Sequence, residues 1–185
     1  MIRGEAVGLR AIERADLPTL LDWRNRPAFR RHFREYRELG LDHQAQWFDT
    51  IALRDERTRM FAVVEPAANL LLGACGLCAI DWLNRTADFS IYIGQDGLYI
   101  DERFAPDAGR TLLRYGFEEL GMHRIWCEIY DFDTAKRRLL AALGFTLDGR
   151  HREAHWGEGG WHDSLFFGIL DREFAARVAT AERVA

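Results

Sequence analysis

The chain has 185 residues, of which 48% are hydrophobic and 29% charged, and its formal net charge is -4. This size and composition predict one globular domain over residues 1–185 with one substantial core. The acidic balance argues against nucleic-acid binding, and no apolar run approaches the roughly 20 residues that cross a bilayer. Because residues 1–5 lack the apolar stretch of a signal peptide, we expect a cytoplasmic protein without a nucleic-acid or membrane partner.

The first half of the chain predicts two helices followed by antiparallel strands. Residues 7–11 alternate as a short strand, and Asp16 opens an amphipathic helix that Pro27 interrupts. A second helix is expected from about Asp42, which is a good N-cap residue. Three strands then follow, at residues 60–64, 70–80 and 87–94.

The second half alternates strands with helices, which implies parallel strand pairing. Residues 107–120 have helical spacing, and a buried strand at 123–130 leads into a helix at 133–143 that Gly144 closes. The remaining predicted elements are a hairpin with strands at 145–155 and 161–170, and a polar helix at 171–184.

Several local signatures occur in a characteristic order. They are Leu21-Asp22-Trp23-Arg24-Asn25, Ala87-Asp88-Phe89-Ser90-Ile91-Tyr92-Ile93-Gly94, the run from Leu112 to Phe117 leading into His123-Arg124-Ile125-Trp126, then Leu143-Gly144-Phe145 and Asp148-Gly149-Arg150. In this order the chain resembles the GNAT acetyltransferases over nearly its whole length, especially their RimJ/RimL-like and amino-sugar N-acetyltransferase branches. The resemblance implies an α+β fold: a mixed, mostly antiparallel sheet of six or seven strands with a parallel, splayed central pair, flanked by about four helices plus a C-terminal helix.

The resemblance also implies acetyl-CoA as co-substrate. Its pantetheine arm would fill the cleft between residues 90–94 and 130–133, pairing with the main chain of Ile91, Tyr92 and Ile93 as a strand would. The pyrophosphate would lie at the N-terminus of the helix expected from Asp107, where free N–H groups favour an anion.

The segment expected to bind phosphate departs from the family pattern of Arg or Gln, two residues, Gly, one residue, then Gly or Ala. Residues 100–105 fill this slot, and of them Ala105 alone fits. Arg103 replaces the central Gly and precedes Phe104, so either Arg103 or Arg110 contacts phosphate directly, or the loop is a solvated charged surface.

Two further positions in the second half depart from the family pattern. Asp133 stands where the family usually has an Asn, and it accepts hydrogen bonds but does not donate them as an amide does. Leu140 stands where many members carry a Tyr that protonates the departing thiolate, so another residue is needed for this role.

Two strand faces carry the candidate catalytic groups. Asp88 and Tyr92 share one face of the middle strand, and Glu128 and Tyr130 share one face of its expected neighbour. If these faces coincide, Glu128 or Asp88 is the general base and Tyr130 a candidate acid. The alternative is that each carboxylate only forms structural hydrogen bonds.

An arginine-rich stretch with interleaved aromatic residues marks the region that borders the acceptor site in this family. From it we predict Trp23, Arg24, Arg30 and Arg31 as substrate-binding residues, and an anionic amine such as a nucleotide-linked amino sugar as acceptor, ahead of a protein N-terminus. The alternative is a solvated helix face whose arginines pair with acidic neighbours.

The sequence therefore predicts an N-acetyltransferase that moves acetyl from acetyl-CoA to a primary amine of a small molecule or of a protein N-terminus. The alternative is a GNAT-fold protein that uses another acyl donor or acts as a non-catalytic binding module. The resemblance also allows a homodimer. We expect no metal site, because Cys75 and Cys78 point to opposite faces of a strand and His151 and His155 lie too far apart.

Overall fold

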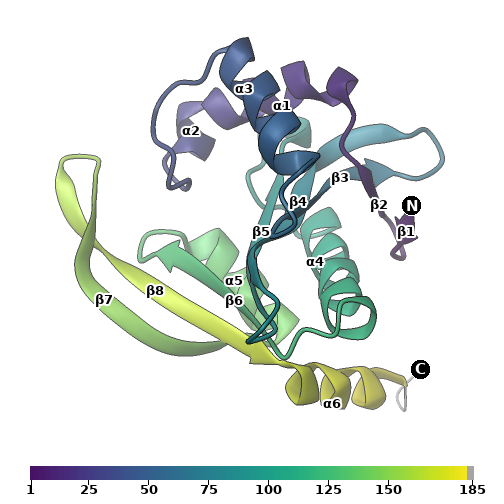
Figure 1. The fold of residues 1–185 in the computed structure, drawn as a ribbon. Helices are drawn as coiled ribbons and strands as arrows, with labels where there is room; N and C mark the ends of the chain where they lie inside the picture. Colours follow the sequence, from purple (N-terminus) through teal and green to yellow (C-terminus); the bar gives the residue numbers. More distant parts are fainter. Residues whose placement is uncertain (183–185) are drawn as a thin grey trace.

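The computed structural model describes residues 1–182, which form a single eight-stranded sheet with helices on both faces (Figure 1). The strands are β1 (Ile2–Arg3), β2 (Gly8–Ala11), β3 (Arg59–Glu65), β4 (Leu70–Asp81), β5 (Thr86–Ile93), β6 (Arg124–Tyr130), β7 (Thr146–Gly157) and β8 (Gly160–Leu170). Their order in the sheet is β1-β2-β3-β4-β5-β6-β8-β7. Only β5 and β6 pair in parallel among these strands. The parallel pairing expected from the alternation in the second half therefore holds for this pair but not for β7, which pairs antiparallel with β8.

Helices cover the sheet in two groups. The α-helices are α1 (Leu17–Asn25), α2 (Pro27–Arg30), α3 (Leu41–Trp47), α4 (Phe104–Arg114), α5 (Thr134–Leu143) and α6 (Asp171–Glu182). Short helical turns are η1 (Arg14–Asp16), η2 (Phe48–Ala52), η3 (Gln95–Gly97) and η4 (Tyr115–Glu119). Apolar side chains of α4, α5 and α6 pack into the larger core, and those of α1 and α2 pack into a smaller core on the opposite face.

The expected α+β GNAT architecture is confirmed, with differences in detail. The sheet has eight strands rather than six or seven because a two-residue strand, β1, pairs with β2 at the edge. Residues 31–40 form neither helix nor strand, so Arg31 does not share a helix face with Arg24 of α1 and Arg30 of α2. The last residues of the helix expected at 171–184 lie outside the described residues.

The central parallel pair opens into a splay. Register pairs run from Thr86 with Arg124 only as far as Asp88 with Trp126, and beyond them β6 continues to pair with β8 alone. The outer half of β5 therefore presents one main-chain edge without a strand partner. This is the splayed parallel pair that the family resemblance implies.

Gly94 ends β5 at a close approach to α1. A Cβ atom at Gly94 would lie 1.9 Å from the nearest ring carbon of Trp23, so the indole packs directly over this main chain. Trp23 is buried in the smaller core, and it supports β5 rather than facing solvent. No helix among residues 1–182 combines the length and the apolarity that a bilayer crossing requires.

Candidate active site

The two predicted carboxylates, Asp88 and Glu128, meet at the point where β5 and β6 begin to diverge, here named the mouth of the splay. Arg34 joins them: its Nη1 donates to Asp88 Oδ2 at 2.7 Å, and its Nε donates to Glu128 Oε2 at 3.0 Å. The faces of β5 and β6 that carry Asp88 and Glu128 thus coincide, which is the condition on which their assignment as candidate bases depended. Arg34 itself was not among the predicted site residues, and its ion pairs with both strands are long-range contacts that no local pattern signals.

Asp88 is the more buried of the two acids, with only 6% of its surface exposed. Burial raises the pKa of Asp88 above its usual range, and the nearby charges of Arg34 and Lys136 counteract only part of that rise. Lys136, the only lysine of the chain, is buried in the first turn of α5. Its charge lowers the pKa of Asp88, and this is a second effect that the sequence did not predict.

Tyr130 lies on the same face of β6 as Glu128. Its ring is buried and stacks on His155, with 3.7 Å between the ring centres. Burial raises the pKa of Tyr130, and Glu128 raises it further, so the phenol holds its proton at neutral pH. A protonated phenol beside a carboxylate has the chemistry of a general acid.

A pocket of about 460 Å³ opens on this side of the sheet. Ser90 and Tyr92 of β5 form part of its floor, directly beyond Asp88 on the same face, and α1, α3 and the segment between α2 and α3 form its walls. Its charged side chains are Arg24, Glu35 and Arg37, and the imidazole of His43 also lines it. The pocket therefore offers both acidic and basic groups to a bound molecule.

The predicted substrate-binding residues separate in space. Arg24 lines this pocket with its guanidinium over the ring of Phe33, while Trp23 lies in the core beneath it. Arg30 and Arg31 line a different groove of about 290 Å³, between α2 and the tip of the β7–β8 hairpin.

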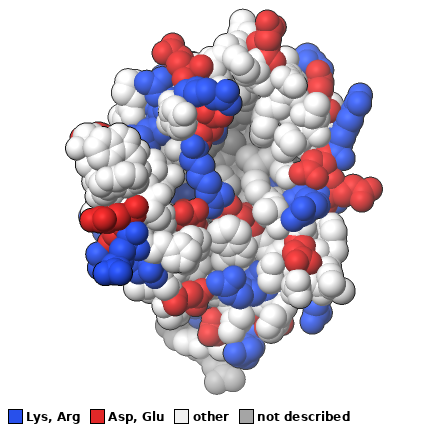
Figure 2. Space-filling view, turned by 60° about the vertical axis from the view of Figure 1, so that its left-hand side comes forward, with Lys and Arg blue, Asp and Glu red and all other residues white. Residues whose placement is uncertain are grey.

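The two arginines of this second groove are already paired. Arg30 lies 3.5 Å from Glu38, and Arg31 lies 2.7 Å from Glu158 on the hairpin. Figure 2 shows basic and acidic side chains interleaved over this hollowed face rather than a field of one sign. The expected cluster of free cations is therefore not present in this arrangement.

The outer half of β5 has some main-chain groups that could pair with a strand-like ligand and others that the chain itself occupies. Gly94 donates its N–H to Leu72 of β4, whereas Ile93 donates its N–H away from β4, to the Tyr99 carbonyl at 2.9 Å. Main-chain groups alternate in direction along a strand, so Ile91 also faces the splay and Tyr92 faces β4. Ile91 offers the kind of edge that a pantetheine amide would pair with, while Ile93 is partly occupied by the chain itself.

The start of α4 does not fit a pyrophosphate as it stands. The helix begins at Phe104, not at Asp107, and the Asp101 carboxylate accepts the N–H groups of Arg103, Phe104 and Ala105 at 3.2, 2.8 and 2.7 Å. These are the donors that a phosphate group would need. An internal carboxylate therefore takes the place expected for the anion.

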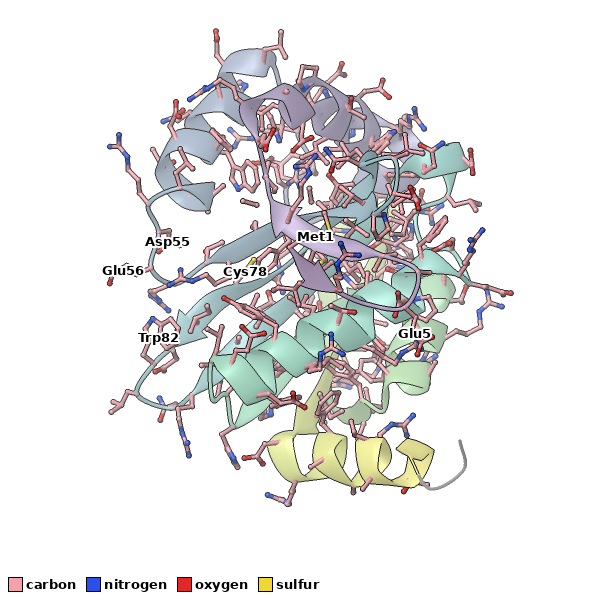
Figure 3. All side chains as sticks on the ribbon, turned by 90° about the vertical axis from the view of Figure 1, so that its right-hand side faces the viewer. Met1, Glu5, Asp55, Glu56, Cys78 and Trp82 are labelled. Atoms are coloured by element: carbon pink, nitrogen blue, oxygen red, sulfur yellow. The ribbon has the colours of Figure 1, made fainter. Side chains whose placement is uncertain are left out.

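Asp107 has a structural role one turn further along α4. Its buried carboxylate accepts N–H groups from Glu5 at 3.2 Å, Ala6 at 2.7 Å and Val7 at 3.0 Å, which ties the start of the chain to the helix. Figure 3 shows Glu5 beside this helix. Arg110 pairs with Asp107 and Glu5, and Arg103 lies over the ring of Phe104.

Asp133 caps α5, accepting the N–H of Lys136 at 3.0 Å. His32 Nδ1 lies 3.3 Å from an Asp133 oxygen but outside hydrogen-bond geometry, and its ring stacks on Tyr99 at 4.2 Å. The buried Tyr99 hydroxyl also has no hydrogen-bond partner among residues 1–182. Two buried polar atoms at the open end of the splay thus lack partners, which marks it as a place for a polar ligand group.

The cysteines take no part in this chemistry. Cys75 lies in the larger core, whereas Cys78, labelled in Figure 3, lines the pocket on the opposite face of β4. Burial raises the pKa of Cys78 to about 11, so this thiol stays protonated. Within the described part of the chain, no three His, Cys, Asp or Glu residues are arranged to hold a metal ion.

Comparison with known proteins identifies the family. Residues 6–146 match the Acetyltransferase (GNAT) domain. The uncharacterized N-acetyltransferase p20 of Bacillus licheniformis is 28% identical over 130 residues, which are 70% of this chain and 71% of that protein. The spermidine N(1)-acetyltransferase of Vibrio cholerae is 26% identical over 169 residues, which are 91% of this chain and 95% of that protein.

Among solved structures, spermidine N-acetyltransferase from Vibrio cholerae in complex with CoA and spermine has the same fold. It superimposes with a TM-score of 0.84 at 24% identity, covering 92% of this chain and 98% of that one. The fold, the splayed strand pair and the family match over most of the chain all indicate the same family. The chain therefore belongs to the GNAT acetyltransferase family and is an acyltransferase.

Proposed function

We propose that this protein transfers acetyl from acetyl-CoA to a primary amine of a small molecule. The observation that carries the proposal is the pocket of about 460 Å³ whose floor continues along β5 from Asp88. A pocket of this size suits a small acceptor better than a folded protein surface. Acetyl-CoA supplies the acetyl thioester, and the residues of this chain orient the acceptor and move its protons.

The proposed proton transfers use the groups at the mouth of the splay. An amine attacks only in its neutral form, so an acceptor that arrives as ammonium passes a proton to Asp88 or Glu128. The raised pKa of Asp88 suits it to accept that proton. As the new C–N bond forms and the C–S bond breaks, the departing thiolate takes a proton, for which Tyr130 is the candidate donor. The proton that the acetylated nitrogen then loses returns the Tyr130 phenolate to the neutral phenol.

A positively charged acceptor, such as a diamine or polyamine, is the first candidate. Two carboxylates, Asp88 and Glu128, face the same side of the splay, and opposite charge favours an ammonium there. The similarity to a spermidine acetyltransferase over 91% of the chain supports the same class.

A nucleotide-linked amino sugar is the second candidate, in keeping with the amino-sugar branch of the family. The groove beside Arg30 and Arg31 contains Phe132 and Trp156, which suit a planar ring, but both guanidinium groups would first have to leave Glu38 and Glu158. Replacing Arg30 and Arg31 with Ala should then raise the KM of such an acceptor and leave that of acetyl-CoA unchanged.

The proposal is tested first by donor binding and then by acceptor turnover. Acetyl-CoA at a hundred times its Kd should stabilise the fold by about 2.7 kcal/mol in a thermal shift, with CoA and longer acyl-CoAs measured beside it. Acetylation is then followed by mass spectrometry with diamines, spermidine, amino-sugar nucleotides and N-terminal peptides. No shift with any acyl-CoA would favour a binding module, and turnover of peptides alone would contradict a small-molecule acceptor.

A further inference from the structure

The guanidinium of Arg34 lies in a cage of three side chains. Two are the carboxylates of Asp88 and Glu128, at 2.7 and 3.0 Å. The third is the indole of Trp126, whose ring centre is 5.8 Å from the guanidinium carbon. Acidic oxygens on one side and an aromatic face on the other are what a protein uses to hold any organic cation.

The cage needs a positive charge, either from Arg34 or from a bound ligand. Asp88 is buried, and Glu128 has only 20% of its side chain exposed, so two negative charges would otherwise face each other with little water between them. Both belong to strands that are fixed in the sheet on their other sides, Asp88 opposite Cys78 of β4 and Glu128 opposite Phe166 of β8. The carboxylates therefore stay in place when the cation is exchanged.

Arg34, in contrast, is loosely held. It belongs to residues 31–40, which form neither helix nor strand, and 55% of its side chain is exposed. The bidentate pair of Arg10 with Asp16 differs in this respect, because their side chains are only 15% and 9% exposed. An exposed arginine on an irregular segment can leave its partners when another cation takes its place, because the buried carboxylates then stay paired.

We propose that Asp88, Glu128 and Trp126 form the binding site for the acceptor's ammonium group, and that Arg34 fills this site until a charged amine displaces it. This inference rests on the proposed function and makes Arg34 a specificity-determining residue. An acceptor with several positive charges replaces the guanidinium without loss of charge, whereas an uncharged amine does not. Arg34 thus favours polycationic acceptors and excludes neutral ones.

The first experiment tests the cage without any acetyl transfer. Arg34→Ala empties it, so methylguanidine or 1,4-diaminobutane at millimolar concentration should raise the melting temperature of this variant by about 2–4 °C. The matched control is Arg14→Ala, which removes an arginine from the exposed pair with Asp49 and should show no such rise, because neither residue lines either pocket. If neither cation stabilises Arg34→Ala more than Arg14→Ala, the cage is not a cation site and the proposal is overturned.

The second experiment measures exchange in the working enzyme. Removal of a resident competitor should lower the KM for spermidine about tenfold in Arg34→Gln and leave the KM for acetyl-CoA unchanged, because a site that is free one tenth of the time binds its ligand tenfold more weakly. A KM for spermidine that rises or stays constant in Arg34→Gln would overturn displacement. If no amine is acetylated by the wild-type protein, the proposed function fails, while the melting experiment still decides the cage.

A third variant covers the case in which the Arg34 variants do not fold. Glu128→Gln keeps Arg34 paired with Asp88 but removes one acidic wall of the cage. Calorimetry should then show binding of 1,4-diaminobutane about tenfold weaker than in the wild-type protein. Unchanged diamine binding in Glu128→Gln would overturn the proposal on its own.

Discussion

The mouth of the splay and the start of α4 use carboxylates in opposite ways. At the mouth, Asp88 and Glu128 bind Arg34, which is 54 and 94 residues away in sequence, through side-chain contacts that another cation can replace. At the start of α4, Asp101 binds the main chain two to four residues ahead of it. The first arrangement leaves a site open to exchange, and the second completes a helix. The proposed acceptor half, Asp88 and Glu128 with Arg34, therefore keeps an exchangeable cation. The proposed donor half, residues 100–105, departs from the family pattern.

The same contrast explains what could be predicted from sequence. Periodicity puts Asp88, Ser90 and Tyr92 on one face of β5, and Trp126 and Glu128 on one face of β6. That the two faces lie on the same side of the sheet was a condition of the prediction, and the structure supplies it. The partner of both acids could not be predicted, because residues 31–40 have no periodic structure and the contact is made only by the tertiary fold.

The start of α4 was misplaced for a local reason. Helical spacing of the apolar residues is clear over residues 107–120, so the pattern predicted a helix from Asp107. Pro106 instead lies within the first turn, where proline is tolerated because its missing N–H has no intrahelical acceptor. The cap comes from Asp101, two residues before the N-cap position, and Asp107 is left to bind the turn at residues 5–7.

Replacing Asp88 or Glu128 should change activity more than any other substitution proposed here. Glu128→Gln or Asp88→Asn should lower kcat by about 10² to 10⁴, because one of these groups is the proposed general base. The rate of the wild-type enzyme should also fall with decreasing pH through the raised pKa of Asp88, since the base must be deprotonated. This acid limb should disappear in Asp88→Asn and persist in Glu128→Gln if Asp88 is the base. Near wild-type rates in both variants would show that solvent water suffices.

Removal of Arg34 gives a second test of the same pH dependence. Arg34 lowers the pKa of Asp88, so its removal in Arg34→Gln should move the acid limb of the rate profile to higher pH. Arg14→Gln serves as the control and should leave the profile where it is, because its partner is the exposed Asp49. A limb that does not move in Arg34→Gln means that the titrating group is not in contact with Arg34.

A smaller effect, on stability, is expected where the Trp23 indole packs against Gly94, directly after β5. A Cβ at Gly94 would overlap the indole, so Gly94→Ala should destabilise the fold by about 1–3 kcal/mol in chemical denaturation. Gly149→Ala on β7 is the matched control, because nothing lies within 4 Å of its added Cβ. Equal stability of the two variants would mean that Trp23 yields easily and is not a rigid support for the splay.

The smallest expected effect tests the donor half. Asp101→Ala frees three N–H groups for a phosphate but removes the helix cap, so the variant should lose about 0.5–2 kcal/mol of stability. It should nevertheless bind CoA about three- to tenfold more tightly, because the internal acceptor and its negative charge no longer compete with the pyrophosphate. Isothermal titration calorimetry measures that affinity directly, apart from any turnover.

Asp101→Asn separates the two contributions of the carboxylate. Asparagine caps a helix about as well as aspartate, so stability should stay near that of the wild-type protein, while the loss of charge alone should tighten CoA binding by less than in Asp101→Ala. Two outcomes are informative about where the anion lies. Graded tightening from wild type through Asn to Ala places the pyrophosphate at the start of α4 in competition with Asp101. Identical CoA affinity in all three proteins would mean that the donor's phosphates bind elsewhere, and that Asp101 is purely a cap in a chain whose donor site has been rebuilt.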